Sequence, residues 1–309
     1  MFKKEKGRSL HRKRAFLTVK ICEHLICPDC QGKLEMREKL ICRSCGRIFS
    51  HNDHFLNLLP TNLIQADLAE EHFWMTDARQ GVKAHPLISL MVSRDPILYF
   101  YEQILPKLEL QGNILEIGSG SCWLSSFVKS AFPQTYIVAT DVAPSALRKG
   151  TQISEFLGCS IDKFMACKVE CLPFESRFFD YVIGSAILHH SCPQEAIRQI
   201  FRVLKHNGTY IGIGELAIPR ILGLLWGSRF GLAGRREKEL GVKEGNYSFS
   251  QWKKFFYNAG FKEVKFILER DPQYKQHWFI NLYYKVVSRI PEVLVRHGLA
   301  SSITIIACR

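Results

Sequence analysis

Residues 113–122 read Asn-Ile-Leu-Glu-Ile-Gly-Ser-Gly-Ser-Cys, and this stretch carries the strongest local signal in the sequence. A short apolar run containing Glu116 leads into Gly118 and Gly120, and a helical pattern begins near Trp123. Glycines are needed at such a turn between a strand and a helix, because a Cβ would obstruct the turn or keep a cofactor off the backbone. The final glycine of the dinucleotide fingerprint GxGxxG is missing. The stretch alone is compatible with an adenosine cofactor or with a tight turn that binds nothing.

An acidic residue closes the next apolar run. Asp141 follows residues 136–140, about twenty positions beyond the glycines. A carboxylate at the tip of a second strand can accept hydrogen bonds from both ribose hydroxyls of an adenosine cofactor. The same side chain could cap the helix expected from Pro144, and one aspartate can serve both purposes. The two features together predict a cofactor pocket at one edge of a sheet.

From Asn113 onward, short apolar runs alternate with helical stretches, which is typical of βα units and a mainly parallel sheet. The sequence therefore predicts an α/β fold with a Rossmann-like sheet of seven strands and an antiparallel ending. Helices are expected before the sheet, the second of them interrupted by Pro106. The expected strands are 113–117, 136–140, 163–167, 179–185, 209–214, 262–269 and 302–308, and the expected helices are 63–74, 97–110, 144–157, 194–204 and 250–259.

Four segments resemble the motifs of class I methyltransferases that use S-adenosylmethionine (SAM), the broad type 11 group. They are LEIGSGSC, TDVAPSALRKG, CLPFESRFFDYVIGSAILHH and RVLKHNGTYIGIGE, within about residues 113–215. The resemblance implies that the methionine end of SAM binds at Glu116, Gly118, Ser119 and Gly120. It further implies that the ribose binds at Asp141 and Val142, and the adenine at residues 168–170, including Val169 and Glu170. Ser185 and Leu188 would line the mouth of the pocket.

The chain departs from the family pattern at two positions. Cys122 stands where many members have a third glycine. Lys168 stands where an acidic residue often contacts the adenine amino group, and Glu170 could substitute for that residue. Both departures concern the pocket directly.

Methyl transfer from a sulfonium is an in-line displacement, and a base is needed only if the acceptor must lose a proton. The candidates are His189 and His190, after the fourth expected strand, and Glu215, after the fifth. All three should lie at the carboxyl edge of the sheet, where ligands of open α/β sheets bind. Each could instead be a packing or helix-start residue.

Two CxxC pairs, Cys27-Pro-Asp-Cys30 and Cys42-Arg-Ser-Cys45, lie eleven residues apart. Four thiolates can complete a tetrahedral, structural zinc site, and this spacing is typical of a zinc ribbon. A disulfide pair and a redox CxxC are the alternatives. His51 and His54 would be surplus ligands.

The segment from His24 to Pro60 resembles the zinc ribbon found ahead of many methyltransferase domains, related to the small activator protein of tRNA methyltransferases. Bacterial 23S rRNA guanine-N1 methyltransferases share this order of domains. They use a histidine at the last ligand position, where this chain has Cys45.

The formal net charge of +13 predicts attraction to polyanions such as nucleic acid or an anionic membrane face. Residues 1–20 form a basic arm with Glu5 as its one acid, which could contact polyanions or act as a transit peptide. No apolar stretch is long enough for a transmembrane span, so we expect a cytoplasmic protein with reduced cysteines. The expected domains are the arm, a zinc ribbon at 21–60 and a SAM-dependent methyltransferase domain at 61–309, with a lid or acceptor-binding insert at about 216–247.

Three functions fit these observations. The first is methylation of a small-molecule, lipid or glycan acceptor, suggested by the generic motifs and the apolar insert. The second is methylation of rRNA or tRNA, suggested by the zinc ribbon and the basic arm, although positive charge alone gives only nonspecific attraction to phosphates. The third is a non-catalytic SAM-binding or zinc-ribbon interaction protein, suggested by Cys122 and Lys168. The sequence favours the first.

Overall fold

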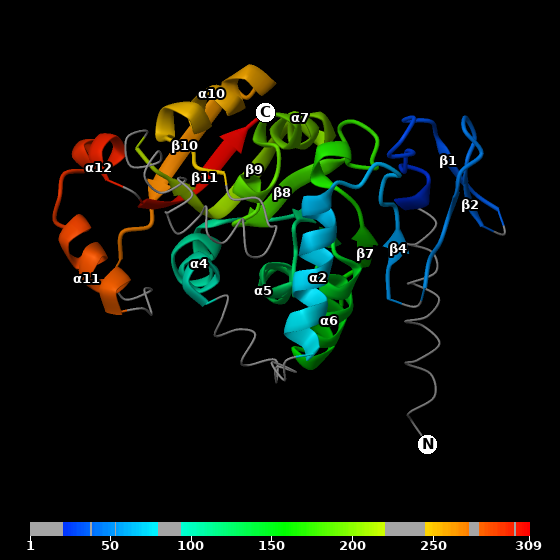
Figure 1. Ribbon diagram of the computed structural model, residues 1–309, viewed down its shortest axis with the longest axis horizontal. Coiled ribbons are helices and arrows are strands. Elements are labelled where there is room, and N and C mark those ends of the chain that lie inside the picture. Colours follow the sequence, from blue (N-terminus) through cyan, green and yellow to red (C-terminus); the bar gives the residue numbers. More distant parts are fainter. Residues whose placement is uncertain are drawn as a thin grey trace.

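The computed structural model describes residues 21–37, 39–52, 54–79, 94–219, 245–271, 278–299 and 301–309. Figure 1 shows a twisted central sheet with helices packed on it. Within the described ranges the sheet has eight strands in the order β10-β11-β9-β8-β5-β6-β7-β4. The predicted basic arm at residues 1–20 lies outside the described residues, as does most of the predicted insert at 216–247.

All seven predicted strands occur. The strands from β7 to β9 in this order pair in parallel, and β11 pairs antiparallel with both β9 and β10, which confirms the predicted antiparallel ending. Their bounds are β5 (Asn113–Ile117), β6 (Tyr136–Asp141), β7 (Lys163–Ala166), β8 (Phe179–Ser185), β9 (Leu204–Ala217), β10 (Glu263–Leu268) and β11 (Ser301–Cys308).

The eighth strand comes from the cysteine-rich segment, so the sheet is one strand wider than predicted. β4 (Leu56–Asn57) pairs in parallel with β7, with Leu56 opposite Met165, and the Leu58 amide donates to the Ala166 carbonyl at 2.8 Å. A two-residue strand is too short to show a period of two, which is why the sequence does not reveal it.

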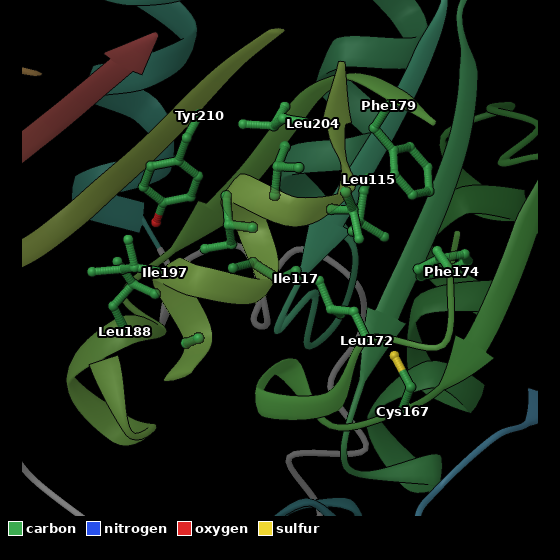
Figure 2. Packing of buried hydrophobic residues seen from close by; sticks show 14 of the residues in the cluster. Leu115, Ile117, Cys167, Leu172, Phe174, Phe179, Leu188, Ile197, Leu204 and Tyr210 are labelled. Atoms are coloured by element: carbon green, nitrogen blue, oxygen red, sulfur yellow. The ribbon is translucent and has the colours of Figure 1, made fainter. Parts of the chain in front are cut away.

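Helices cover both faces of the sheet, because strand residues alternate between two hydrophobic clusters. Leu115 and Ile117 of β5 belong to the cluster that contains Ile197 of α7, and Figure 2 shows these three side chains. Ile114 belongs to the opposite cluster, with Leu124 of α5. The helices are α5 (Trp123–Ala131), α6 (Pro144–Phe156), α7 (Pro193–Val203) and α10 (Phe249–Ala259), close to the predicted bounds.

Local sequence signals fix the ends of α10. Ser248 and Gln251 form a reciprocal capping box at its start, which satisfies amides that have no partner inside the helix. Gly260 follows its last residue with a φ of 106°, a left-handed conformation that glycine adopts without a Cβ penalty.

The helices outside the repeating βα units differ more from the prediction. The predicted helix at 97–110 is divided into α4 (Arg94–Tyr99), the π-helical η1 (Phe100–Ile104) and the 3-10 helix η2 (Leu105–Lys107), because Pro106 cannot continue a regular helix. The helix predicted at 63–74 is α2 (Gln65–Arg79). Two further helices, α11 (Trp278–Val287) and α12 (Glu292–Gly298), lie between β10 and β11 and were not predicted.

The cysteine-rich segment forms a three-stranded antiparallel sheet of β1 (Leu34–Met36), β2 (Leu40–Cys42) and β3 (Ile48–Phe49). It is joined to the main body at Leu25, which bridges to Phe174, and by the Ile26 amide, which donates to the Pro173 carbonyl at 3.1 Å. Buried residues of this segment and of the main sheet form one continuous hydrophobic cluster. The segment therefore packs as part of the main body.

Among the described residues, no helix combines the length and the apolar character needed to cross a membrane.

Candidate functional site

The glycine turn after β5 has the backbone geometry that its sequence requires. Gly118 and Gly120 have φ values of 57° and 49°, in the left-handed region that residues with a Cβ rarely adopt. A Cβ on Gly118 would lie 2.4 Å from the Ile187 side chain. The turn therefore leaves bare backbone facing the space above the carboxyl ends of the strands.

Cys122 also has a positive φ, 59°, which explains why glycine is favoured at this position. Its side chain is fully buried, and its thiol donates to Ser119 Oγ at 3.4 Å. The sulfur fits against α6 because Gly150 has no side chain there; a Cβ on Gly150 would lie 2.4 Å from Cys122 Sγ. Cys122 thus points into the core and not into the cavity described below.

This fit predicts a steric coupling. Gly150→Ala should destabilise the protein by about 1–3 kcal/mol, since overpacking a closed core outweighs the better helix propensity of alanine. The double substitution Cys122→Ala with Gly150→Ala should restore most of the loss, because it removes the sulfur. Thermal unfolding of both variants measures this.

Gly298→Ala in α12, where a Cβ meets nothing within 4 Å, is the matched control. Equal melting temperatures for Gly150→Ala and the wild type would contradict the proposed contact.

Asp141 connects the end of β6 to the glycine turn. Its Oδ2 accepts from the Gly120 amide at 2.8 Å and its Oδ1 accepts from the Ala143 amide at 2.8 Å. Burial raises the pKa of this carboxyl to about 6. It is an ionisable acceptor held rigidly at the cavity wall.

A cavity of about 730 Å³ lies at the carboxyl edge of the parallel strands, where open α/β sheets bind ligands. One side is the sheet edge with the glycine turn, and the opposite side is α2. The cysteine-rich segment closes one end. The lining includes Gly118, Gly120, Thr140, Asp141, Val142, Cys167, Lys168, Val169, Glu170, Cys171, Ser185, Ala186, Ile187 and His190 from the main body, Asp67, Glu70, Phe73 and Trp74 from α2, and Pro28 and Asp29 from the first CxxC pair.

Seven of the nine residues predicted to contact the cofactor line this cavity: Gly118, Gly120, Asp141, Val142, Val169, Glu170 and Ser185. Glu116 does not. It is buried beneath the turn, where its Oε2 accepts from the Ser125 amide at 3.3 Å and from the Ser125 hydroxyl, and burial raises its pKa to about 8. The pleat of β5 turns it toward α5. Ser119 is also buried and contributes its amide to the Thr140 carbonyl at 2.8 Å.

Lys168 is engaged with α2. Its Nζ lies 2.7 Å from Asp67 Oδ2, and both side chains are largely buried. The neighbouring Glu170 Oε1 accepts from the Cys192 amide at 2.8 Å. A buried ion pair that lost one partner would leave an uncompensated charge, so Lys168 and Asp67 hold α2 against the cavity.

The three candidate bases differ in whether they reach the cavity. Glu215 is fully buried and accepts from the amides of Ile187 and Leu188 at 2.9 and 2.8 Å, and His189 Nδ1 lies 2.7 Å from its Oε2. Burial alone would raise the pKa of Glu215, but the charge and hydrogen bond of His189, the hydrogen bond from the Leu188 amide and the charge of His190 together lower it. Neither Glu215 nor His189 lines the cavity, whereas His190 does.

The residues near these candidate bases also divide into those that line the cavity and those that support it from the core. Glu215 and His189 hold the loop after β8, including the 3-10 helix η4 (Leu188–His190). Leu188, expected at the mouth, is instead fully buried in the core.

Comparison with known proteins finds similarity to methyltransferases. A model of the methyltransferase domain family matches residues 114–208. An uncharacterised methyltransferase-like protein of Schizosaccharomyces pombe is 28% identical over 160 residues, which are 50% of this chain and 55% of that protein. A chloroplastic 2-methyl-6-phytyl-1,4-hydroquinone methyltransferase of Arabidopsis thaliana is 27% identical over 157 residues, 49% of this chain and 40% of that protein.

Residues 114–208 of this chain are therefore similar to a methyltransferase domain. The geranyl diphosphate C-methyltransferase of Streptomyces coelicolor A3(2), solved with geranyl diphosphate and S-adenosyl-L-homocysteine, shares the fold: the TM-score is 0.58 at 12% identity, over 81% of this chain and 100% of that one. The chain spans about half the length, or less, of the two curated relatives named above.

A thiol cluster lies in the cysteine-rich segment. The sulfur atoms of Cys27, Cys30, Cys42 and Cys45 all lie within 4.8 Å of one another. Cys27 Sγ is 3.9 Å from Cys45 Sγ, and Cys30 Sγ is 3.5 Å from Cys42 Sγ. Zinc–sulfur bonds of about 2.3 Å in a tetrahedron place sulfurs about 3.8 Å apart. His51 and His54 are exposed and do not belong to the cluster.

The contributions of α2 and of Asp29 to the cavity were not predicted. A Cβ on Gly120 would lie 3.0 Å from Trp74, so this ring packs over the glycine turn. Glu71 Oε2 accepts from the Ser145 amide at 2.9 Å, which fixes α2 to the start of α6. The sequence predicts the helix but has no local signal for the surface that it covers.

Proposed function

We propose that the chain binds SAM in this cavity and transfers its methyl group to a small-molecule, lipid or glycan acceptor. The observation that carries the proposal is the cavity itself. It is formed at the carboxyl edge by the bare glycine backbone and the adjoining Asp141 carboxylate on one side and by α2 on the other. Its volume of about 730 Å³ is within the usual range for cofactor pockets.

The lining suits the parts of SAM in the order expected from the resemblance. The backbone at Gly118 and Gly120 would hold the methionine end, and Asp141 with Val142 would hold the ribose. Val169 and Glu170, in the 3-10 helix η3 (Val169–Cys171), would face the adenine. Glu116 and Ser119 would support the turn from beneath. When bound, SAM supplies a methyl group on a sulfonium.

The residues of the chain contribute positioning and exclusion of water. Trp74 and Phe73 cover the cavity from α2, and Ser185 and His190 line it on the β8 side. Holding an acceptor in line with a methyl group in such a site accounts for much of the rate of a displacement. If the acceptor must lose a proton, His190 is the base, since Glu215 and His189 are engaged with each other.

The charge of the lining favours this acceptor class over rRNA or tRNA. The phosphates of a nucleic acid would meet several carboxylates at close range, and like charges in a cleft raise the cost of binding. The hydroquinone acceptor named for the Arabidopsis relative is compatible with this preference. The carboxylates are Asp29, Asp67, Glu70, Asp141 and Glu170, against the single lysine Lys168 in the described lining.

The hypothesis of a non-catalytic protein rests on the two departures from the family pattern, and the positions of these two side chains weaken it. Cys122 lies in the core against Gly150, and Lys168 is paired with Asp67. Cys122 is absent from the described lining of the cavity, and Lys168 lines it as one member of an ion pair.

We also propose that the four cysteines hold a structural zinc ion, in a reducing compartment such as the cytoplasm. The separations of the sulfur atoms fit a tetrahedral Cys₄ site, which leaves no open position for a substrate. Zinc would fix Pro28 and Asp29, which close one end of the cavity.

Incubation with methyl-labelled SAM tests the choice of acceptor. The protein is supplied with total RNA in one reaction and with a lipid and metabolite extract in another. We expect label to appear in the extract. His190→Ala should abolish this labelling only for acceptors that must lose a proton. Label in RNA alone would refute the proposed acceptor class.

A further inference from the structure

Helix α11 has two apolar faces, and only one of them is buried. Tyr284 and Val287 pack it onto the body, with exposed fractions of 5% and 0%. Trp278, Leu282 and Val286 recur at the four-residue spacing of one helix face and are 63%, 55% and 56% exposed. A helix that is apolar on all sides is normally buried on all sides. The second face is therefore a candidate surface for contact with a membrane or another molecule.

Helix α12 also exposes apolar side chains. Val293 and Leu294 are 61% and 59% exposed, while Val295 between the helix and the body is fully buried. Figure 1 shows α11 and α12 together at the β10 end of the sheet, far from the cysteine-rich segment. We call Trp278, Leu282, Val286, Val293 and Leu294 the apolar face. Exposed large apolar side chains gathered at one end of a protein mark interaction sites.

A basic groove adjoins the apolar face. It has a volume of about 640 Å³ and lies between α10, β10 and α12. Arg296 reaches it from α12, where its Nη2 donates to the Phe266 carbonyl at 3.1 Å. Glu292 is the one acid in its described lining and is paired with Arg296. The cations that line the groove are Lys253, Lys265, Arg270 and Arg296.

The groove and the apolar face meet on α12. Glu292 and Arg296, four residues apart, share the side of α12 that faces the groove, whereas Val293 follows on the next side. Outside the groove, Lys285 and Arg289 are exposed beside the apolar residues of α11. Exposed tryptophan and aliphatic side chains flanked by lysine and arginine are the pattern of a helix that lies in a membrane interface.

We propose that α11 and α12 dock the protein onto the surface of an anionic lipid bilayer. The apolar face enters the boundary between headgroups and acyl chains, and the basic groove takes anionic headgroups. An RNA backbone would pair with the groove but would leave Trp278, Leu282 and Val286 in water. A second copy of the chain would bring two basic grooves together, which like charges disfavour. The proposal concerns a surface remote from the cavity and does not depend on the proposed methyl transfer.

Co-sedimentation of the full chain with lipid vesicles tests this docking. The vesicles are pure phosphatidylcholine or phosphatidylcholine with phosphatidylglycerol. We expect binding to the phosphatidylglycerol vesicles, about tenfold or more weaker binding by Leu282→Ser with Val286→Ser, and weaker binding by Lys253→Glu with Lys265→Glu. Ile48→Ser with Phe156→Ser, at two equally exposed apolar sites elsewhere, is the matched control and should bind as the wild type does.

Three results would overturn the proposal. The first is unchanged vesicle binding by Leu282→Ser with Val286→Ser, which would assign the attraction to basic residues elsewhere. The second is RNA binding that depends on Lys253 and Lys265 without any vesicle binding. The third is a dimer in sedimentation velocity that these serine substitutions dissociate while vesicles bind nothing. Melting temperatures of all variants show whether each is folded.

Discussion

Replacement of Asp141 by alanine is expected to weaken SAM binding by about 100-fold or more. Hydrogen bonds to a charged group contribute about 1.5–3 kcal/mol each, and this carboxylate would accept from two ribose hydroxyls. Alanine also removes the acceptor for the Gly120 and Ala143 amides, which lie 2.8 Å from the carboxylate oxygens, and so loosens the glycine turn. Calorimetric titration with SAM measures the effect.

The same carboxylate predicts the pH dependence of binding. Burial raises the pKa of Asp141 to about 6, so the group is ionised at pH 7.5 and becomes protonated as the pH falls through about 6. Because the ionised form accepts the hydroxyl hydrogen bonds, the dissociation constant for SAM should rise about tenfold per pH unit below that value.

Two comparisons make the Asp141 result specific. Glu155→Gln changes an exposed carboxyl on α6 and should leave SAM affinity unaltered. Asp141→Asn keeps the size of the side chain and should also bind weakly. Wild-type affinity in a folded Asp141→Ala protein would remove Asp141 from the cofactor site.

Loss of the zinc site is expected to have the largest effect on stability. Cys42→Ala should abolish zinc binding and destabilise the protein by several kcal/mol, because metal binding contributes directly to folding in such sites. The loss should spread beyond the segment, since Cys27 and Cys42 belong to the same buried cluster as Leu115 and Phe179. Metal analysis by mass spectrometry and thermal unfolding with and without a chelator measure both effects.

Cys159→Ala is the control for the zinc prediction, because Cys159 lies outside the cluster of four. It should retain one zinc ion per chain and melt close to the wild type. A wild-type protein that contains no zinc, or one whose melting temperature a chelator leaves unchanged, would contradict the structural role.

The repeating part of the fold could be predicted from sequence because each element has its own local signal. The glycine turn, the acidic strand tip and the apolar runs from Asn113 to Glu215 predict five parallel strands and the sequence order of the residues at their ends. Cys27, Cys30, Cys42 and Cys45 could be grouped from spacing alone, and their sulfur atoms do lie together.

The remainder depends on contacts between distant residues. The pairing of β4 with β7, the position of α2 over the cavity and the fit of Cys122 against Gly150 have no signature within a short window. Glu215 illustrates the limit most clearly: its place at a strand end predicts a site residue, whereas its burial against His189 and the loop after β8 makes it a support. Helices α11 and α12 were missed because their apolar residues face both the body and the exterior.

Calorimetric titration of the 309-residue, zinc-loaded chain with SAM at pH 7.5 tests the assignment of the cavity most directly. We predict one SAM bound per chain, with a dissociation constant between about 1 μM and 1 mM, and a melting temperature that rises with SAM concentration. Absence of both heat and a melting shift at millimolar SAM would contradict the assignment of the cavity.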